Sequence, residues 1–114
     1  MDATQLILLY DYYGDLLTDR QKECFELRYN QDLSLGEIGQ ELGISRQGVF
    51  DNLSRTEALL KNMEAKTGCV RRDIQCRKAM HLIREAVQQL CDCSDPAVAE
   101  LAEQIAEITR EIEE

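Results

Sequence analysis

Proline, histidine and long hydrophobic runs are all scarce in this sequence, and each scarcity excludes a class of protein. One proline in 114 residues argues against an all-β sandwich, whose turns are rich in proline and glycine. No run approaches the roughly 20 apolar residues of a membrane-spanning helix, so we expect no membrane association. The sequence begins MDATQ, without the basic residues of a secretory signal, which predicts a cytoplasmic protein.

The sequence also lacks the residue patterns of metal, redox and catalytic sites. Its cysteines are odd in number and form no CxxC pair: Cys24, Cys69, Cys76, Cys91 and Cys93. Without a secretion signal we interpret them as reduced thiols, and His81 is the only histidine that could help to bind a metal. We find no glycine-rich phosphate loop and no nucleophile beside a base. We therefore expect that the protein is not an enzyme and that it binds no cofactor and no metal.

Acidic side chains outnumber basic ones, 22 to 13, which gives a formal net charge of −9. Such a chain is repelled by nucleic acid unless its basic groups cluster, and its acidic surface suits a basic partner. Residues 34–66 are the least acidic third of the chain. A nucleic-acid role would therefore depend on a local patch there.

The first 30 residues predict two helices. Apolar residues recur at three- and four-residue steps within residues 4–17, and Gly14 is expected to end this amphipathic helix. The residues expected to face inward are Leu6, Leu9, Tyr10, Tyr13 and Leu17. Thr18 and Gln21 have the spacing of a capping box, which would begin a second helix. That helix is expected to bury Cys24, Phe25, Leu27 and Tyr29.

A short helix, a glycine turn and a longer helix follow in the order of a helix-turn-helix. Ser34 and Glu37 form the expected capping box of the short helix, and the small Gly39 would allow another helix to approach closely. Gly43 is expected to adopt positive φ and end this helix. Ser45 would cap the next helix, which could run to about residue 66. Ile38, Ile44, Val49 and Leu53 are expected to hold the two helices together, and Leu59, Leu60 and Met63 to continue the stripe.

The last third of the chain carries two heptad stripes. The first contains Cys76, Met80, Ile83, Val87 and Leu90, and the second Val98, Leu101, Ile105, Ile108 and Ile112. Pro96 suits a first helical position, with Asp95 or Ser94 as its cap. The short loop between the stripes predicts an antiparallel hairpin, which packs on the rest of the chain or on a second copy. The predicted class is all-α: a helix-turn-helix domain over residues 1–67 and a helical hairpin over 68–114, with homodimerisation left open.

The predicted second helix of the helix-turn-helix supplies the candidate nucleic-acid-binding residues. Arg46 could contact phosphate or guanine, and the amides of Gln47 and Asn52 could read adenine. Ser45 and the backbone N–H groups at the helix start could hold a phosphate, and Arg55 lies within reach of the nucleic-acid backbone. Asp51 on the same helix would repel phosphate. The alternative is a solvated polar face, with Asp51 and Arg55 paired across one turn.

These residues resemble known proteins. The segment LLTDRQKECFELRY and the helix-turn-helix that follows it resemble the fourth region of sigma factors, which reads the −35 promoter element. The segments LLYDYYGDLLTDRQ, SLGEIGQELGISRQGVFDN and SRTEALL are more similar to the YlxM-like helix-turn-helix proteins linked to the signal recognition particle. The similarity is close over residues 6–67, and the acidic helical tail agrees in type.

The resemblance implies a non-enzymatic accessory or regulatory protein of co-translational protein targeting. Its partners would be the GTPase of the signal recognition particle, the particle's RNA, or both. The alternative is a DNA-binding transcriptional regulator. The sigma-like contacts carry over only to Ser45, Arg46, Gln47, Asn52 and Arg55. Sigma factors often have a basic residue where this chain has Phe50 or Asp51, which speaks against ordinary promoter binding.

Overall fold

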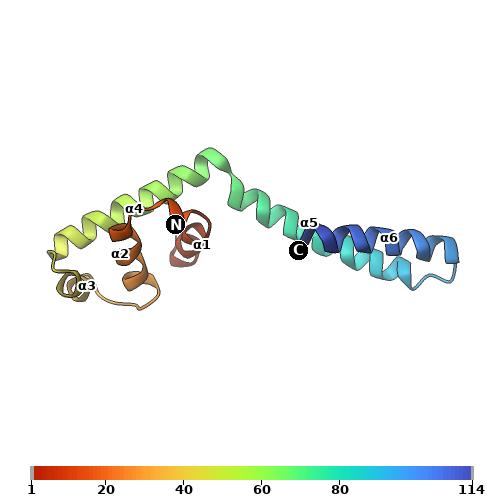
Figure 1. The fold of residues 1–114 in the computed structure, drawn as a ribbon, viewed down its shortest axis with the longest axis horizontal. Coiled ribbons are helices and arrows are strands. Elements are labelled where there is room, and N and C mark those ends of the chain that lie inside the picture. The colour runs from red at the N-terminus through yellow and green to blue at the C-terminus, as the bar shows by residue number, and fades with distance from the viewer. Residues whose placement is uncertain (1, 114) are drawn as a thin grey trace. The chain divides into compact units, whose positions relative to one another are not determined.

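The computed structural model describes residues 2–113, which contain six α-helices and no strand (Figure 1). The helices are α1 (Ala3–Tyr13), α2 (Asp19–Tyr29), α3 (Leu35–Leu42), α4 (Arg46–Thr67), α5 (Cys69–Cys91) and α6 (Pro96–Glu113). A single 3₁₀ turn, η1 (Gly14–Leu16), follows α1. The all-α prediction is therefore confirmed.

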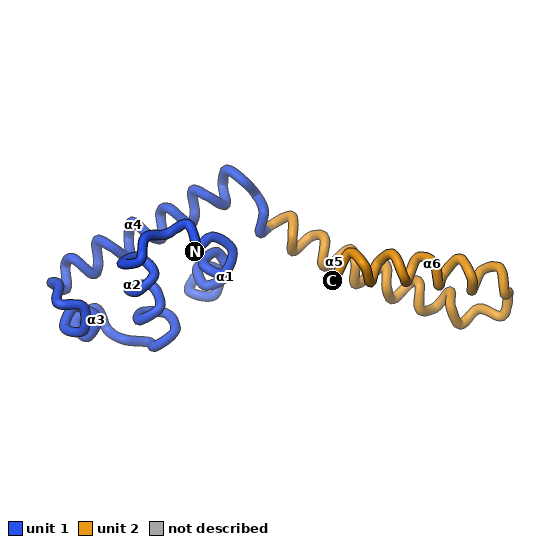
Figure 2. The backbone as a smooth tube through the Cα atoms, viewed as in Figure 1, with its two compact units in different colours: residues 1–70 blue, residues 71–114 orange. Residues whose placement is uncertain are grey.

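The helices form two compact units, residues 1–70 and residues 71–114 (Figure 2). The first contains α1 to α4 and the start of α5. Val70, the last residue of this unit, is 5% exposed and belongs to its core. The second unit consists of the remainder of α5 and of α6, joined by a short loop.

In the first unit, α1, α2 and α3 lie along one side of α4 and bury one stripe of it (Figure 1). The expected inward residues of the first two helices form much of this core, with Cys24 and Phe25 almost completely buried. Val49, Leu53 and Leu60 of α4 are buried as the pattern predicts. The prediction for Leu59 is wrong, because its side chain is 39% exposed. One turn earlier, Thr56 is buried instead and donates its hydroxyl to the Asn52 carbonyl oxygen at 2.9 Å.

Local signals set the helix boundaries as predicted. Thr18 and Gln21 form a reciprocal capping box at α2, and Ser34 and Glu37 form one at α3. In each box, the hydroxyl accepts one backbone N–H and the side chain three residues later accepts another. The accepted hydrogen bonds from Ser34 lower the pKa of the Glu37 carboxyl, because they favour its charged form.

The turn between α3 and α4 depends on two glycines. Gly43 has φ of 70°, the left-handed conformation that ends α3 and turns the chain. Gly39 is buried, and a Cβ there would lie 2.7 Å from the Ile44 carbonyl oxygen. The expected close approach is therefore made by the backbone of the turn into α4. This contact allows α4 to begin directly after the turn, at Arg46 with Ser45 as its N-cap.

In the second unit, α5 and α6 lie alongside each other, and the Arg84 guanidinium pairs with the Glu113 carboxylate at 3.1 Å. Asp95 caps α6 by accepting the Ala97 backbone N–H at 3.0 Å. Val87 of α5 is buried, and so are Ala102 and Thr109 of α6. The large residues of the second heptad stripe do not form this seam: Leu101, Ile105, Ile108 and Ile112 are 41–66% exposed.

Candidate nucleic-acid interface

Helix α4 begins at Arg46, as predicted, and Ser45 is its N-cap. The Ser45 hydroxyl, which was expected to contact phosphate, makes the capping hydrogen bond. Ser45 is extended, with φ −72° and ψ 157°, and its Oγ accepts the Gly48 backbone N–H at 2.9 Å. Arg46 then opens the helix with an exposed side chain. The Ser45 hydroxyl can still donate to a phosphate while it accepts from Gly48, because a hydroxyl has both capacities.

Arg46, Gln47 and Arg55 are all exposed on α4. The Gln47 side-chain amide donates to Asp51 Oδ1 at 3.0 Å, one helical turn further along. Asp51 therefore accepts a hydrogen bond from the Gln47 amide, the group that was expected to read a base edge. It does so in place of the pair with Arg55 that the alternative interpretation predicted. A nucleic-acid base would have to displace this exposed hydrogen bond.

Asn52 is not brought together with these residues. It is half-buried, and its Oδ1 is buried without a hydrogen-bond partner among residues 2–113. At about 100° per residue, Asn52 lies on the flank of α4 next to buried Val49 and Thr56, away from Gln47. A base contact by Asn52 would need its side chain to turn outward.

Two of the three acidic residues of α4, Glu57 and Glu64, are directed toward tyrosines of α1 and α2. The Tyr29 hydroxyl donates to Glu57 Oε1 at 2.7 Å, and the Tyr13 hydroxyl donates to Glu64 Oε1 at 2.7 Å. Both glutamates are half-buried as a result. Burial and the hydrogen bond to Glu57 raise the pKa of Tyr29 to about 12, so its hydroxyl remains a donor at neutral pH.

The exposed charge of α4 is consequently basic. Arg46, Arg55, Lys61 and Lys66 are exposed, and within α4 only Asp51 is an exposed acidic residue. We call these four basic side chains the α4 basic face; at ~100° per residue they span about half the circumference of the helix. The sequence did not identify Lys61 and Lys66 as candidates. When only the charges of α4 are counted, the negative charges of Glu57 and Glu64 balance the positive charges of these two lysines. The tyrosines at helical spacing in α1 and α2 were the available signal, since a buried tyrosine hydroxyl needs a partner.

Two large apolar side chains are also exposed on α4. Phe50 is 51% exposed and Leu59 is 39% exposed. Leu59 lines a shallow groove together with Gln21, Arg55, Ala58 and Asn62. A helix of this length, ~33 Å at ~1.5 Å per residue, could place its basic groups against several phosphates of a nucleic-acid backbone.

The described part of the chain contains neither a candidate metal site nor a candidate membrane-spanning helix. Among residues 2–113, no group of three or more His, Cys, Asp or Glu side chains could hold a metal ion. No helix in the same range is both long and apolar enough to cross a membrane. The expectations of no metal, cofactor or enzymatic activity stay predictions.

The short α3, the left-handed Gly43 turn and the capped α4, with its polar side uncovered by α1, α2 and α3, define a helix-turn-helix protein. Residues 1–96 match the UPF0122 family, described as "Putative helix-turn-helix protein, YlxM / p13 like". The chain therefore belongs to the UPF0122 family, which confirms the resemblance to YlxM-like proteins.

Individual relatives cover between 76% and 99% of the chain. A UPF0122 protein of Thermoanaerobacter sp. (strain X514) is 44% identical over 114 residues, which cover 99% of this chain and 95% of the relative. A UPF0122 protein of Acetivibrio thermocellus is 41% identical over 107 residues, covering 94% of this chain and 86% of the relative. One from Anoxybacillus flavithermus is 40% identical over 87 residues, covering 76% and 79%.

Proposed function

We propose that this protein is a non-enzymatic accessory or regulatory protein of the signal recognition particle pathway in the cytoplasm. It acts through its helix-turn-helix and through the acidic surface of α6. Family membership supports this proposal together with the sequence resemblance to YlxM-like proteins linked to the particle. The observation that carries it is the separation of charge, with a basic face on α4 and an acidic α6.

Each of the two surfaces suits one component of a ribonucleoprotein. Helix α6 holds five acidic residues and one basic residue, which complements the basic RNA-binding surface of the particle's GTPase. The α4 basic face suits the RNA phosphates. Side chains cannot read the deep, narrow major groove of RNA, so α4 would recognise phosphates and shape rather than base sequence. This mode does not require Asn52 or Gln47 to reach a base.

The test is affinity purification of the tagged protein from its native cell at low salt, with proteins and RNA both identified. The expected result is co-purification of the particle's GTPase and RNA. Absence of both under gentle conditions contradicts the proposal. In a binding titration with the purified RNA, the affinity should fall by ~0.7–0.9 log units per phosphate contact for each log unit of salt.

Paired variants test whether RNA binding depends on the α4 basic face or on the net charge of the protein. The double change Arg46→Ala and Arg55→Ala should weaken RNA binding and reduce the salt slope by ~1–2. Lys22→Ala is the control, because Lys22 lies on α2 and its 3.9 Å pair with the exposed Asp15 contributes little. An equal loss per charge removed in Lys22→Ala and in the double variant would assign the binding to net charge alone.

A DNA-binding transcriptional regulator is the second candidate, favoured by the exposure of Arg46 and Gln47 at the start of α4. These are the positions at which a recognition helix meets base edges in the DNA major groove. Selection of bound fragments from genomic DNA tests it. Enrichment of one sequence, lost in Gln47→Ala, supports this candidate. Binding to all fragments alike, or to none, contradicts it.

A further inference from the structure

The hairpin of the second unit has a groove on one face and a set of large apolar residues on the opposite face. Arg84 and Gln88 of α5 line a groove together with Glu103 and Arg110 of α6, so these four residues share one face. At about 100° per residue, six of the large apolar residues of the two helices lie on the flank opposite to this groove. They are Ile83, Leu90, Leu101, Ile105, Ile108 and Ile112, which we call the hairpin apolar face.

The hairpin apolar face is uncovered within the second unit. Its six side chains are 41–66% exposed, so about half of the surface of each is in contact with water. The contact between α5 and α6 is made instead by smaller residues, with Ala102 and Thr109 buried on α6. Single exposed apolar residues are ordinary, but a contiguous face on two adjacent helices indicates an interface.

The spacing of the exposed residues identifies the kind of surface that would fit. Leu101, Ile105, Ile108 and Ile112 follow each other at steps of four, three and four. This is the heptad spacing of helices that pack side by side at a small angle. The matching surface is therefore another long helix, or a pair of them, carrying the same repeat. A second copy of this hairpin supplies two long helices, and they carry the same repeat.

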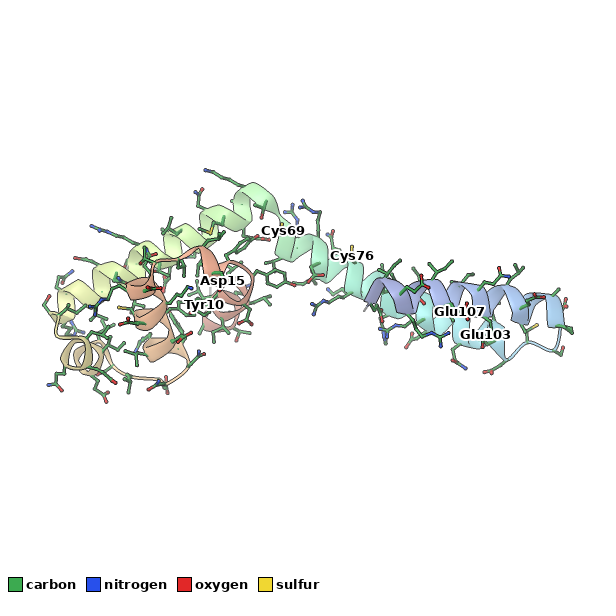
Figure 3. The ribbon with its side chains drawn as sticks, viewed as in Figure 1. Tyr10, Asp15, Cys69, Cys76, Glu103 and Glu107 are labelled. Carbon is green, nitrogen blue, oxygen red and sulfur yellow. The ribbon has the colours of Figure 1, made fainter. Side chains whose placement is uncertain are left out.

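The charges of the two helices favour a second copy over other partners. Helix α5 carries five basic and two acidic residues, whereas α6 carries one basic and five acidic residues, including Glu107 (Figure 3). A partner of one charge sign would meet repulsion from one of the two helices. A two-fold axis that runs along the helices places each α5 opposite the α6 of the other copy, so that opposite charges meet.

We infer that two copies of this chain associate through the hairpin apolar face and form an antiparallel four-helix bundle. The large residues of each copy then fill the centre of the bundle, which a single hairpin lacks. Each chain would keep its own helix-turn-helix in the first unit. The dimer would thus carry two α4 basic faces, which strengthens binding to any partner that both can reach.

Light scattering after size-exclusion chromatography of the full chain measures the association directly. The expected mass is twice the 13.1 kDa of one chain, with a shift toward a single chain on dilution. A single-chain mass at every concentration at which the protein remains monodisperse would overturn the inference. It would equally be overturned by a mass that fits only a larger assembly.

Matched variants then locate the interface. Ile108→Glu places a carboxylate in the proposed bundle centre and should raise the dimer dissociation constant at least about tenfold. Gln88→Glu adds the same charge on the groove face and should leave the constant within a factor of about two. Circular dichroism should show that both variants keep their helix content. An unchanged dimer in Ile108→Glu, or equal weakening by both variants, contradicts the inference.

A third variant separates this face from the apolar residues of the first unit. Leu59→Glu alters an exposed side chain of α4 that lies outside the hairpin. It should leave the dimer intact. If Leu59→Glu dissociates the dimer and Ile108→Glu does not, the interface is on α4 and the proposed bundle is wrong.

Discussion

The Tyr13 hydroxyl of α1 donates a 2.7 Å hydrogen bond to Glu64 Oε1 of α4, and the same oxygen accepts the Val70 backbone N–H at 3.0 Å. Thr67 Oγ1 lies 2.6 Å from the Tyr13 hydroxyl and accepts the Cys69 backbone N–H at 3.3 Å. These contacts satisfy two N–H groups at the start of α5, where helices lack internal partners. Gly68, with φ of 63°, adopts the left-handed conformation that ends α4.

Loss of the Glu64 carboxylate should therefore destabilise the first unit. Glu64→Ala leaves the buried Tyr13 hydroxyl and the Val70 N–H without this acceptor and should cost about 2–3 kcal/mol of unfolding free energy. Glu64→Gln, which keeps one acceptor oxygen, should cost less. Urea unfolding followed by circular dichroism gives the values. Glu23→Gln is the control, because its 3.9 Å pair with Arg20 is exposed.

A double-mutant cycle checks that the effect passes through Tyr13. The combined loss in Tyr13→Phe with Glu64→Ala should be smaller than the sum of the single losses by about 1 kcal/mol. Additive losses would show that the two side chains act independently, contrary to the observed hydrogen bond.

The turn of the helix-turn-helix should respond differently to alanine at its glycines. Gly39→Ala should be the more damaging change, because its Cβ would lie 2.7 Å from the Ile44 carbonyl oxygen and the backbone would have to shift. Gly43→Ala should cost about 1–2 kcal/mol, since φ of 70° is unfavourable with a Cβ. Gly36→Ala is the control within α3. Its Cβ would meet only the Ser34 hydroxyl at 4.0 Å, so stability should be unchanged or slightly higher.

Stability should decline at alkaline pH because of two half-buried tyrosines, Tyr10 and Tyr29. Burial and hydrogen bonds to glutamates raise the pKa of Tyr10 and of Tyr29 to about 12, against about 10 in the unfolded chain. Between these values the unfolded state binds fewer protons than the folded state, so unfolding becomes more favourable as pH rises. Their stabilising contribution is complete below pH ~10 and is lost as pH rises toward ~12.

Urea unfolding at several pH values between 9 and 12 measures this decline. Tyr29→Phe removes one titrating hydroxyl and should make the decline shallower, although its stability at neutral pH should be lower. A decline of the same steepness in Tyr29→Phe and in the unaltered protein would assign the alkaline loss to other groups.

The cysteines should fall into two reactivity classes. Burial raises the pKa of the Cys24 thiol, which is 0% exposed in the core of the first unit. Cys69, Cys76 and Cys93 are exposed, and the first two lie on α5 (Figure 3). Iodoacetamide labelling followed by mass spectrometry should modify the exposed thiols rapidly and Cys24 only as the protein unfolds. Rapid labelling of Cys24 in the folded protein would contradict the described core.

Much of the fold could be predicted because its signals act over three or four residues. The caps at Thr18, Ser34, Ser45 and Asp95 each join a side chain to a backbone N–H of its own helix start. The left-handed Gly43 is equally local. The candidate site was predicted less completely. Gln47 and Asn52 have the same amide chemistry, yet only the packing of α4 decided that one is exposed and the other half-buried.

The sequence by itself determined that the chain is helical, where most helices begin, and where a helix-turn-helix lies, because these depend on contacts within one turn. Only the tertiary structure decided which charges of α4 face outward, since Glu57 and Glu64 turn toward tyrosines 28 and 51 residues away in sequence. It also decided which stripe of α6 meets α5. Heptad spacing fixes which residues share a flank, but the partner of that flank depends on the packing of whole helices.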